Sequence, residues 1–267
     1  MIKPGEIQLK AREAGVRDQQ IEKDYVLSWI LQGIAQHQQL SKVLVFKGGT
    51  VLKKIYFDDY RFSEDLDFTL LKDENSNEQI FKWFGELFLY VREEANIPLN
   101  ITDNNAHEDG GINFYIAYTG PLGGLGSNKK VKVDISRREE LVFKPALKSA
   151  IVSYSDQQKH KLLCSPLEEV LLEKMRSVMQ RMQARDFYDL WHLLEVKELD
   201  ASHYTKEFAE KCDGKNLKAD DFMKKLKERL PQYKGRWQHS LNEQIKNLPD
   251  FDTTEREVMR RLKKFKV

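Results

Sequence analysis

The chain has 267 residues, of which 40% are hydrophobic and 32% charged, a balance typical of a folded globular protein and not of a disordered one. It contains no run of about 18 apolar residues, and its N-terminus lacks an apolar signal core, so we expect neither a membrane span nor secretion. Two cysteines are too few for a disulfide framework or a structural zinc site, which favours a cytoplasmic protein.

The net charge of +2 is spread unevenly. Residues 211–267 hold 16 Lys and Arg against 9 Asp and Glu, a surplus of +7, and the rest of the chain holds 28 against 33, or −5. A basic region of this kind is typical of proteins that contact phosphate backbones. A solvated helical surface would have the same composition, so both interpretations stay open.

Helical and strand patterns alternate in the N-terminal part. Apolar residues recur at helical spacing in residues 19–39, where Asp18 can cap the helix, and again in 50–57 and 78–95. The pattern predicts strands at residues 42–47, 66–71, 99–102, 112–119 and 130–135, with an edge strand at 150–154. Residues 120–126 are glycine-rich, and we favour a hairpin connection there over a flap that closes on a nucleotide.

From Ser165 onward the pattern becomes helical. Ser165, Pro166 and Glu168 have the spacing of a capping box with proline in the first turn, which predicts a helix start. Further helices are predicted at residues 184–196, 218–231, 236–247 and 254–265. The chain is therefore predicted to be α+β, with an α+β domain over residues 1–157 and an all-helical domain over residues 158–267.

Asp65 and Asp67 carry the clearest chemical signal. Residues two apart on a strand point to the same face, so both carboxylates would project side by side, with Leu66 and Phe68 toward the core. Two carboxylates about 4 Å apart repel by roughly 4 kcal/mol at an effective dielectric near 20. A shared proton or a divalent cation would offset that repulsion. The plainer alternative is two exposed acids at a strand end.

Two neighbouring features favour the cation. Gly48, Gly49 and Thr50 stand between a predicted strand and a predicted helix, where backbone N–H groups can face an anion. Asp134 is a polar residue on an otherwise apolar strand, and it needs a partner because an unpaired buried carboxylate is costly. Three acids that converge on phosphate-bound metal ions would form the two-metal arrangement for attack on a phosphoryl group.

Two residues of the helical part break their local pattern. Lys174 lies in the apolar stripe of its helix, where a lysine either snorkels outward, the commoner outcome, or meets an anion. Asp186 opens the next helix, where a carboxylate interacts favourably with the helix N-terminus. The six histidines show no spacing typical of metal ligands.

Five segments occur in order and together resemble the AbiEii/AbiGii toxin family of nucleotidyltransferases, within the DNA polymerase β-like superfamily. They are residues 47–53 (Lys-Gly-Gly-Thr-Val-Leu-Lys), 61–67 (Arg-Phe-Ser-Glu-Asp-Leu-Asp), 132–134 (Lys-Val-Asp), 168–174 and 185–190 (Arg-Asp-Phe-Tyr-Asp-Leu). The resemblance extends over about residues 20 to 195. It implies a polymerase β-like core, a mixed sheet flanked by helices, followed by an all-helical C-terminal domain.

The resemblance also implies roles for individual residues. Asp65, Asp67 and Asp134 would bind Mg²⁺, with Asp134 acting as a ligand or as the base for the attacking hydroxyl. Lys174 would contact the triphosphate, and Asp186 would support the site from the helical domain. The residues implied for nucleotide binding besides Lys174 are Gly48, Gly49, Thr50, Lys53, Arg61 and Ser63.

The implied activity is Mg²⁺-dependent transfer of NMP from an NTP to an acceptor hydroxyl on tRNA or another RNA. The protein would be the toxin of a bacterial toxin–antitoxin or phage-defence system, with an antitoxin as its partner. Two alternatives remain from the residues alone. The acceptor could be a protein or a small molecule, because the fold does not choose among acceptors. The chain could also be a catalytically silent protein that binds an antitoxin.

Overall fold

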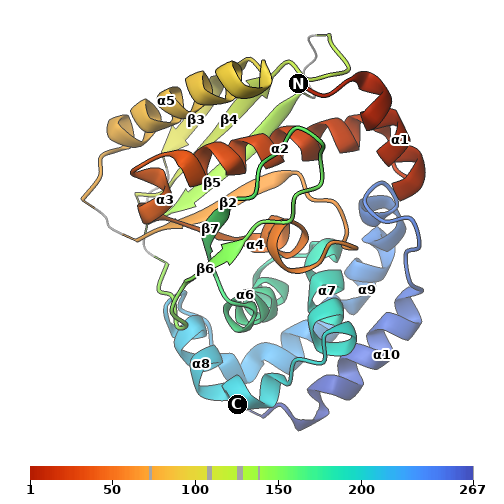
Figure 1. Ribbon diagram of the computed structural model, residues 1–267. Coiled ribbons are helices and arrows are strands. Elements are labelled where there is room, and N and C mark those ends of the chain that lie inside the picture. Colours follow the sequence, from red (N-terminus) through yellow and green to blue (C-terminus); the bar gives the residue numbers. More distant parts are fainter. Residues whose placement is uncertain (72–73, 107–109, 125–128, 138, 267) are drawn as a thin grey trace. The chain divides into compact units, whose positions relative to one another are not determined.

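The computed structural model describes residues 1–266 apart from 72–73, 107–109, 125–128 and 138 (Figure 1). Within the described residues, contacts divide the chain into two compact units. Unit 1 comprises Met1–Glu139 and Pro145–Ser165, and unit 2 comprises Glu140–Lys144 and Pro166–Val267. Unit 1 combines a sheet with helices and unit 2 is helical, so the predicted α+β class with a helical C-terminal part is confirmed.

Unit 1 is built on a mixed sheet, which in the described part of the chain has seven strands in the order β3-β4-β5-β2-β1-β7-β6. The strands β2 and β5 are parallel, as are β1 and β7, and the other neighbouring strands are antiparallel. The bounds are β1 Leu44–Lys47, β2 Asp65–Leu70, β3 Leu99–Ala106, β4 Ile112–Tyr118, β5 Lys130–Ser136, β6 Ala146–Ser149 and β7 Lys161–Cys164.

Helices cover the apolar face of this sheet. Phe84 of α5 packs edge-on against Phe114 of β4, with ring centroids 4.9 Å apart, and α2 runs beside α5 (Figure 1). Because side chains alternate along β4, Asn113 and Tyr115 point to the opposite, polar face. The helices of unit 1 are α1 Pro4–Ala14, α2 Asp18–Gln36, α3 Leu40–Val43, α4 Gly48–Val51 with the π-helical turn η1 Leu52–Tyr56, and α5 Asn77–Ala95.

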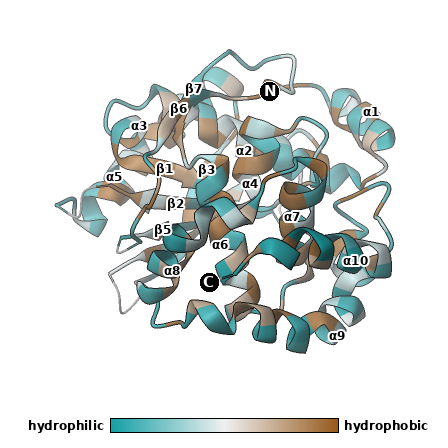
Figure 2. Ribbon diagram, turned by 90° about the horizontal axis from the view of Figure 1, so that it is seen from below, coloured by the Kyte–Doolittle hydropathy of each residue, from teal (hydrophilic) through white to brown (hydrophobic). Residues whose placement is uncertain are grey.

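Aromatic packing holds unit 2 together. Phe187 stacks on Tyr233, with centroids 5.3 Å apart and planes 6° apart, and lies 5.6 Å from Phe251. Figure 2 shows both hydrophobic and hydrophilic stretches on α9 and α10, as expected for helices with one buried face. The α-helices are α6 Leu167–Gln180, α7 Ala184–Trp191 with the π-helical turn η2 His192–Val196, α8 Thr205–Asp213, α9 Phe222–Leu241 and α10 Phe251–Arg261.

The sequence predictions for the sheet are confirmed in its centre and wrong at one edge. The strands predicted at residues 42–47, 66–71, 112–119 and 130–135 correspond to β1, β2, β4 and β5. The edge strand predicted at 150–154 is wrong, because β6 ends at Ser149 and pairs with β7, which was not predicted. Both strands have four residues, too few for alternation to be recognised. The domain boundary predicted after residue 157 would separate β7 from the rest of the sheet, although β7 pairs with β1.

Three predictions about helix ends are wrong. Arg17 and Pro166 occupy the cap positions of α2 and α6 in place of Asp18 and Ser165. Ser165 instead extends the sheet, since its N–H donates to the carbonyl of Phe46 at 3.0 Å. The helices predicted at 218–231 and 236–247 are one helix, α9, with Pro231 inside it. Proline removes one backbone N–H donor but does not always end a helix.

The hairpin favoured for residues 120–126 is confirmed, because β4 and β5 pair as antiparallel neighbours on either side of that segment; residues 125 and 126 lie outside the described part. Glu22 of α2 is fully buried and accepts the backbone N–H of Leu122 at 2.8 Å. It also forms an ion pair with Lys129 at 2.9 Å. The start and end of the hairpin loop are thereby fixed to α2. Among the described helices, none is both long and apolar enough to cross a membrane.

Candidate active site

The three predicted acids lie on neighbouring strands and share the polar face of the sheet. The parallel register of β2 and β5 places Asp67 directly beside Asp134, and Asp65 precedes Asp67 by two residues on β2. All three are half-buried, whereas Leu66 and Phe68 between and after them are 0% exposed. The prediction that both β2 carboxylates point away from the core is therefore confirmed.

Two lysines accompany these acids. Lys47, at the end of β1, is the cross-strand neighbour of Asp67. Lys132 lies on β5, and its Nζ is 3.4 Å from Oδ2 of Asp134. Glu139 pairs with Lys47, so the side chains named here are four carboxylates and two ammonium groups. Among these six side chains alone, the negative charges outnumber the positive ones by two, a balance that a divalent cation would offset.

Gly48 makes room for one of the carboxylates. Its φ is +77°, and a Cβ at this position would lie 2.3 Å from Oδ2 of Asp67. A side chain would therefore clash with the carboxylate and force a strained backbone. The turn after β1 accordingly sets the position of the Asp67 carboxylate.

Two hydroxyl groups join this turn to the segment before β2. The hydroxyl of Thr50 lies 2.8 Å from that of Ser63 and also bonds to the backbone carbonyl of Asp65. Thr50 is 1% exposed and Ser63 is 7% exposed, so both groups are packed beneath the start of β2. The structure thus brings Gly48, Thr50 and Ser63 together with the acids of β2, as expected.

The helical segment after the turn is fixed to α2 by a buried ion pair. Nζ of Lys54 lies 2.5 Å from Oδ2 of Asp24 and 2.7 Å from Oγ of Ser28. Burial lowers the pKa of Lys54, and the carboxylate of Asp24 opposes that shift. This pair holds α4 and η1, and with them Gly49 and Thr50, against the helical layer.

Lys53 and Arg61 are used within the segment that leads to β2. Nζ of Lys53 bonds to the carbonyl of Asp58 and lies 4.8 Å from the ring centroid of Phe62. Arg61 is 3% exposed, and its Nη1 donates to the carbonyl of Phe62 at 3.1 Å. Both contacts shape residues 58–62. The expected role of Lys53 and Arg61 in nucleotide binding stays a prediction.

Lys174 and Asp186 belong to a buried charge cluster in unit 2. Nζ of Lys174 lies 2.9 Å from Asp186 and 2.7 Å from Asp189. Lys174 is 5% exposed and both aspartates are 0% exposed, so of the two outcomes left open for this lysine, snorkelling or an anion, the structure shows the anion. Burial would raise the pKa of Asp186, but Lys174 and Arg181 outweigh burial and lower it.

Comparison with known proteins decides the family. The family described as nucleotidyl transferase AbiEii toxin, type IV TA system, matches residues 29–257. The chain belongs to this family. It is therefore a nucleotidyltransferase, of the toxin type found in type IV toxin–antitoxin systems. No curated protein matches the chain.

Solved structures share the fold of this AbiEii family member. MenT4, a nucleotidyltransferase toxin from Mycobacterium tuberculosis H37Rv, aligns with a TM-score of 0.66 and 20% identity, over 98% of this chain and 88% of that one. JHP933 from Helicobacter pylori aligns with a TM-score of 0.57 and 20% identity, over 93% and 92% of the two chains. At this identity the likeness shows the fold alone.

The acids of the AbiEii family member fit magnesium through their charge and through the position that Gly48 allows the Asp67 carboxylate to take. Among the described residues, no group of three or more His, Cys, Asp or Glu side chains is arranged so that it could hold a metal ion. Mg²⁺ usually takes one or two carboxylates with water and substrate phosphates, so it does not need such a cluster. The pair Asp67 and Asp134, adjacent in register, is of the size that this ion uses.

Sequence reasoning missed three charged residues of these clusters. Asp189 lies three residues after Asp186 on α7, and this spacing puts both on one helix face, a signal that could have found it. Lys47 belongs to a motif but was predicted to have no role of its own, and Glu139 was not predicted. Their pairing joins residues 92 positions apart and has no local signal.

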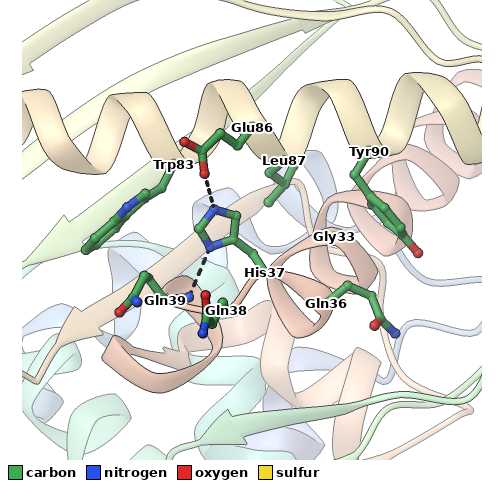
Figure 3. A pocket seen from close by; sticks show the side chains of 9 residues that line it. All are labelled: Gly33, Gln36, His37, Gln38, Gln39, Trp83, Glu86, Leu87 and Tyr90. Atoms are coloured by element: carbon green, nitrogen blue, oxygen red, sulfur yellow. Dashed lines mark hydrogen bonds and ion pairs between the residues drawn. The ribbon is translucent and has the colours of Figure 1, made fainter.

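A cavity of about 290 Å³ lies elsewhere in unit 1, on α2 and α5 (Figure 3). His37 stands in it, with Nε2 3.1 Å from Glu86 and Nδ1 accepting the backbone N–H of Gln39 at 3.2 Å. Trp83 and Tyr90 line it from α5. Since α5 covers the apolar face of the sheet, this cavity is separated from the acids by the sheet itself.

Part of the basic surplus of the C-terminal region is offset within unit 2. Arg260 and Arg261 lie 2.5 and 2.7 Å from Glu195. Lys211 lies 2.5 Å from the buried Glu169. Lys224 and Lys227 of α9 are exposed. Contact of the basic region with phosphates stays a prediction.

Changing Gly48 to alanine is expected to reduce both activity and stability. The added Cβ must displace the Asp67 carboxylate, and the left-handed backbone adds strain of about 1–3 kcal/mol. Gly85→Ala is the matched control, because Gly85 lies in α5 with nothing within 4 Å of a new Cβ, and it should stabilise slightly. Thermal unfolding and nucleotide transfer of both variants check this, and a fully active Gly48→Ala protein would contradict it.

Proposed function

We propose that this nucleotidyltransferase binds Mg²⁺ and an NTP at Asp65, Asp67 and Asp134. It would transfer NMP to a hydroxyl group of an RNA, and the acceptor we propose is tRNA. The observation that carries the proposal is the register that sets Asp67 beside Asp134, on the face where Asp65 also lies. The second support is the Gly48 turn, where a Cβ would collide with the carboxylate of Asp67.

The residues divide the chemical work as follows. Bound Mg²⁺ supplies Lewis-acid stabilisation of the charge that develops on the transferring phosphoryl group. Asp65 and Asp67 hold the ion, and Asp134 completes the ligands or accepts the proton of the attacking hydroxyl. The hydroxyl oxygen forms a bond to the α-phosphorus, the bond to pyrophosphate breaks, and pyrophosphate leaves. The backbone of Gly48 and Gly49 and the hydroxyls of Thr50 and Ser63 contact the phosphates.

We further assign Lys174 to the triphosphate, with Asp186 orienting its ammonium group. The support is the order and spacing of residues 168–174 and 185–190, which resemble the motifs of the family, together with the ion pair between the two residues. Lys53 and Arg61 are assigned to nucleotide binding on the same resemblance. Lys53 and Arg61 bond to the carbonyls of residues 58 and 62. We therefore assign them an indirect role as well, in which they shape the segment that leads to the nucleotide.

The proposed setting is the bacterial cytoplasm, where NTPs, Mg²⁺ and tRNA are available. The exposed lysines of α9, such as Lys224 and Lys227, would attract the phosphates of the acceptor. A cognate antitoxin is the expected partner, as the type IV toxin–antitoxin family implies.

A single labelling experiment that contains RNA, protein and small-molecule acceptors together identifies the acceptor. The purified chain is incubated with Mg²⁺ and each labelled NTP in turn, together with total RNA, cell protein and small-molecule acceptors. We expect label in RNA of tRNA size, with the added nucleotides found at 3′ ends by sequencing. Label that appears only in protein, or only in a small molecule, would contradict the RNA acceptor and leave the transferase assignment intact.

A further inference from the structure

Lys47 occupies an unusual place for a lysine. It ends β1, opposite Asp67 in the antiparallel register, and its side chain is only 9% exposed. Its Nζ donates to Oγ of Ser136 at 3.3 Å and pairs with Glu139, whose side chain is 8% exposed. Burying two opposite charges this far is favourable only when the geometry and the remaining hydrogen bonds are good.

The place of this pair in the sheet suggests more than a structural role. Cross-strand neighbours on one face lie about 5 Å apart at their Cβ atoms, so the row Lys47, Asp67, Asp134 brings one cation beside two adjacent carboxylates. The residue after Lys47 is Gly48, where an added Cβ would collide with Oδ2 of Asp67. Two consecutive residues therefore act on the carboxylate of Asp67: Lys47 through its positive charge, and Gly48 because it has no side chain to clash with it.

We propose that Lys47 and Glu139 form a positioning pair that sets the charge around Asp67. Lys47 offsets the repulsion between Asp67 and Asp134 before the metal arrives. Glu139 and Ser136 hold the ammonium group so that it does not itself take the place of the cation between the two carboxylates. The inference rests on the proposed function in one respect, namely that Asp67 and Asp134 bind Mg²⁺.

The pair predicts opposite effects for its two members. Lys47→Met removes a positive charge from the acid row, so Mg²⁺ should bind more tightly. Glu139→Gln removes the negative charge that holds the ammonium group, so Lys47 should pair more closely with Asp67 and compete with Mg²⁺. At short range one unit charge changes the binding of a divalent ion by about fivefold or more. The double variant should return toward the wild-type affinity, because both charges are gone.

The experiment measures binding of Mg²⁺ alone to the full chain, by calorimetric titration and by Mg²⁺-dependent thermal shift. We expect the Kd to fall about fivefold or more in Lys47→Met and to rise about fivefold or more in Glu139→Gln. Lys47→Arg keeps the positive charge and should keep the wild-type Kd within about twofold. Lys130→Met is the matched control, since Lys130 also lies on this sheet but pairs at 2.9 Å with the exposed Asp103; its Kd should not change.

The outcomes separate this inference from the proposed function. If the Kd changes equally and in the same direction in both variants, or changes in neither, the inference is overturned. Lys47 and Glu139 would then be an ion pair with a structural role only. If Lys47→Met does not fold, Glu139→Gln alone decides, because its side chain keeps its size; an unchanged Kd there overturns the inference. Asp67→Asn tests the metal site itself, and undiminished Mg²⁺ binding in that variant would remove the proposed function instead.

Discussion

Replacing Asp67 with asparagine is expected to slow nucleotide transfer by about 10³-fold or more. Asparagine keeps the size of the side chain above Gly48 but removes the charge that holds the cation beside Asp134. Metal ions stabilise the transition state of phosphoryl transfer by several kcal/mol, and each 1.36 kcal/mol is tenfold in rate. Asp65→Ala should abolish incorporation for the same reason.

The measurement is incorporation of labelled NMP into RNA by wild type and by both variants at equal concentration. Thermal unfolding must show that each variant is folded, which we expect because the acids are half-buried and lie at the start of β2. Asp103→Asn is the matched control: Asp103 lies on β3 and is 58% exposed, so its loss should leave the rate within about twofold. Full activity in folded Asp67→Asn or Asp65→Ala would contradict the site.

Replacing Lys174 with methionine is expected to lower the free energy of unfolding by about 3–5 kcal/mol, the usual effect of breaking a buried ion pair. Asp186 and Asp189 are 0% exposed and each lies within 2.9 Å of Nζ of Lys174. Asp186 keeps Arg181, at 2.6 Å, but Asp189 loses the ammonium group. Methionine fills most of the space of the lysine side chain, so the decrease in the free energy of unfolding reflects the missing charge and not a cavity.

Urea unfolding of the two proteins at neutral pH measures this difference. Lys206→Met is the control, because Lys206 is 85% exposed and reaches Glu210 only at 4.0 Å, and such pairs contribute little. A Lys174→Met protein as stable as wild type would show that the cluster is not stabilising. The nucleotide-transfer rate of Lys174→Met is then measured without urea, at a temperature at which the variant is folded.

The pH dependence gives an independent check of the same cluster. The pKa of Asp186 is lowered in the folded protein, so its ionised form contributes stability above the ordinary aspartate value of about 3.9. That contribution is lost as the pH falls through the lower, folded value. The stability difference between wild type and Lys174→Met should therefore narrow on acidification, and a difference that widens would contradict the ion pair.

The acids of β2 could be predicted because their signal is local. Asp65, Leu66 and Asp67 follow the two-residue period of a strand, and the structure has the same alternation. The position of Asp134 beside Asp67 depends on the parallel pairing of β2 and β5, which no spacing along the chain reveals. The resemblance to a family supplied that pairing indirectly, through the order of the motifs.

The errors also have physical causes. Pro231 lies inside α9 with its own side chain exposed, while Tyr233 and Trp237 beyond it pack into the core of unit 2. That packing outweighs the missing N–H donor. For Lys174 the sequence left snorkelling and an anion open, and the structure gives it two buried anions, Asp186 and, three residues later, Asp189. Tertiary contacts decided both cases.

The most direct test is a crystal structure of the chain with Mg²⁺ and an NTP analogue that cannot be hydrolysed. We predict a cation about 2.0–2.1 Å from carboxylate oxygens of Asp65, Asp67 or Asp134, with triphosphate oxygens completing its coordination and the Gly48 turn beside them. A cation and nucleotide bound away from these carboxylates, with the three acids left in solvent, would contradict the account.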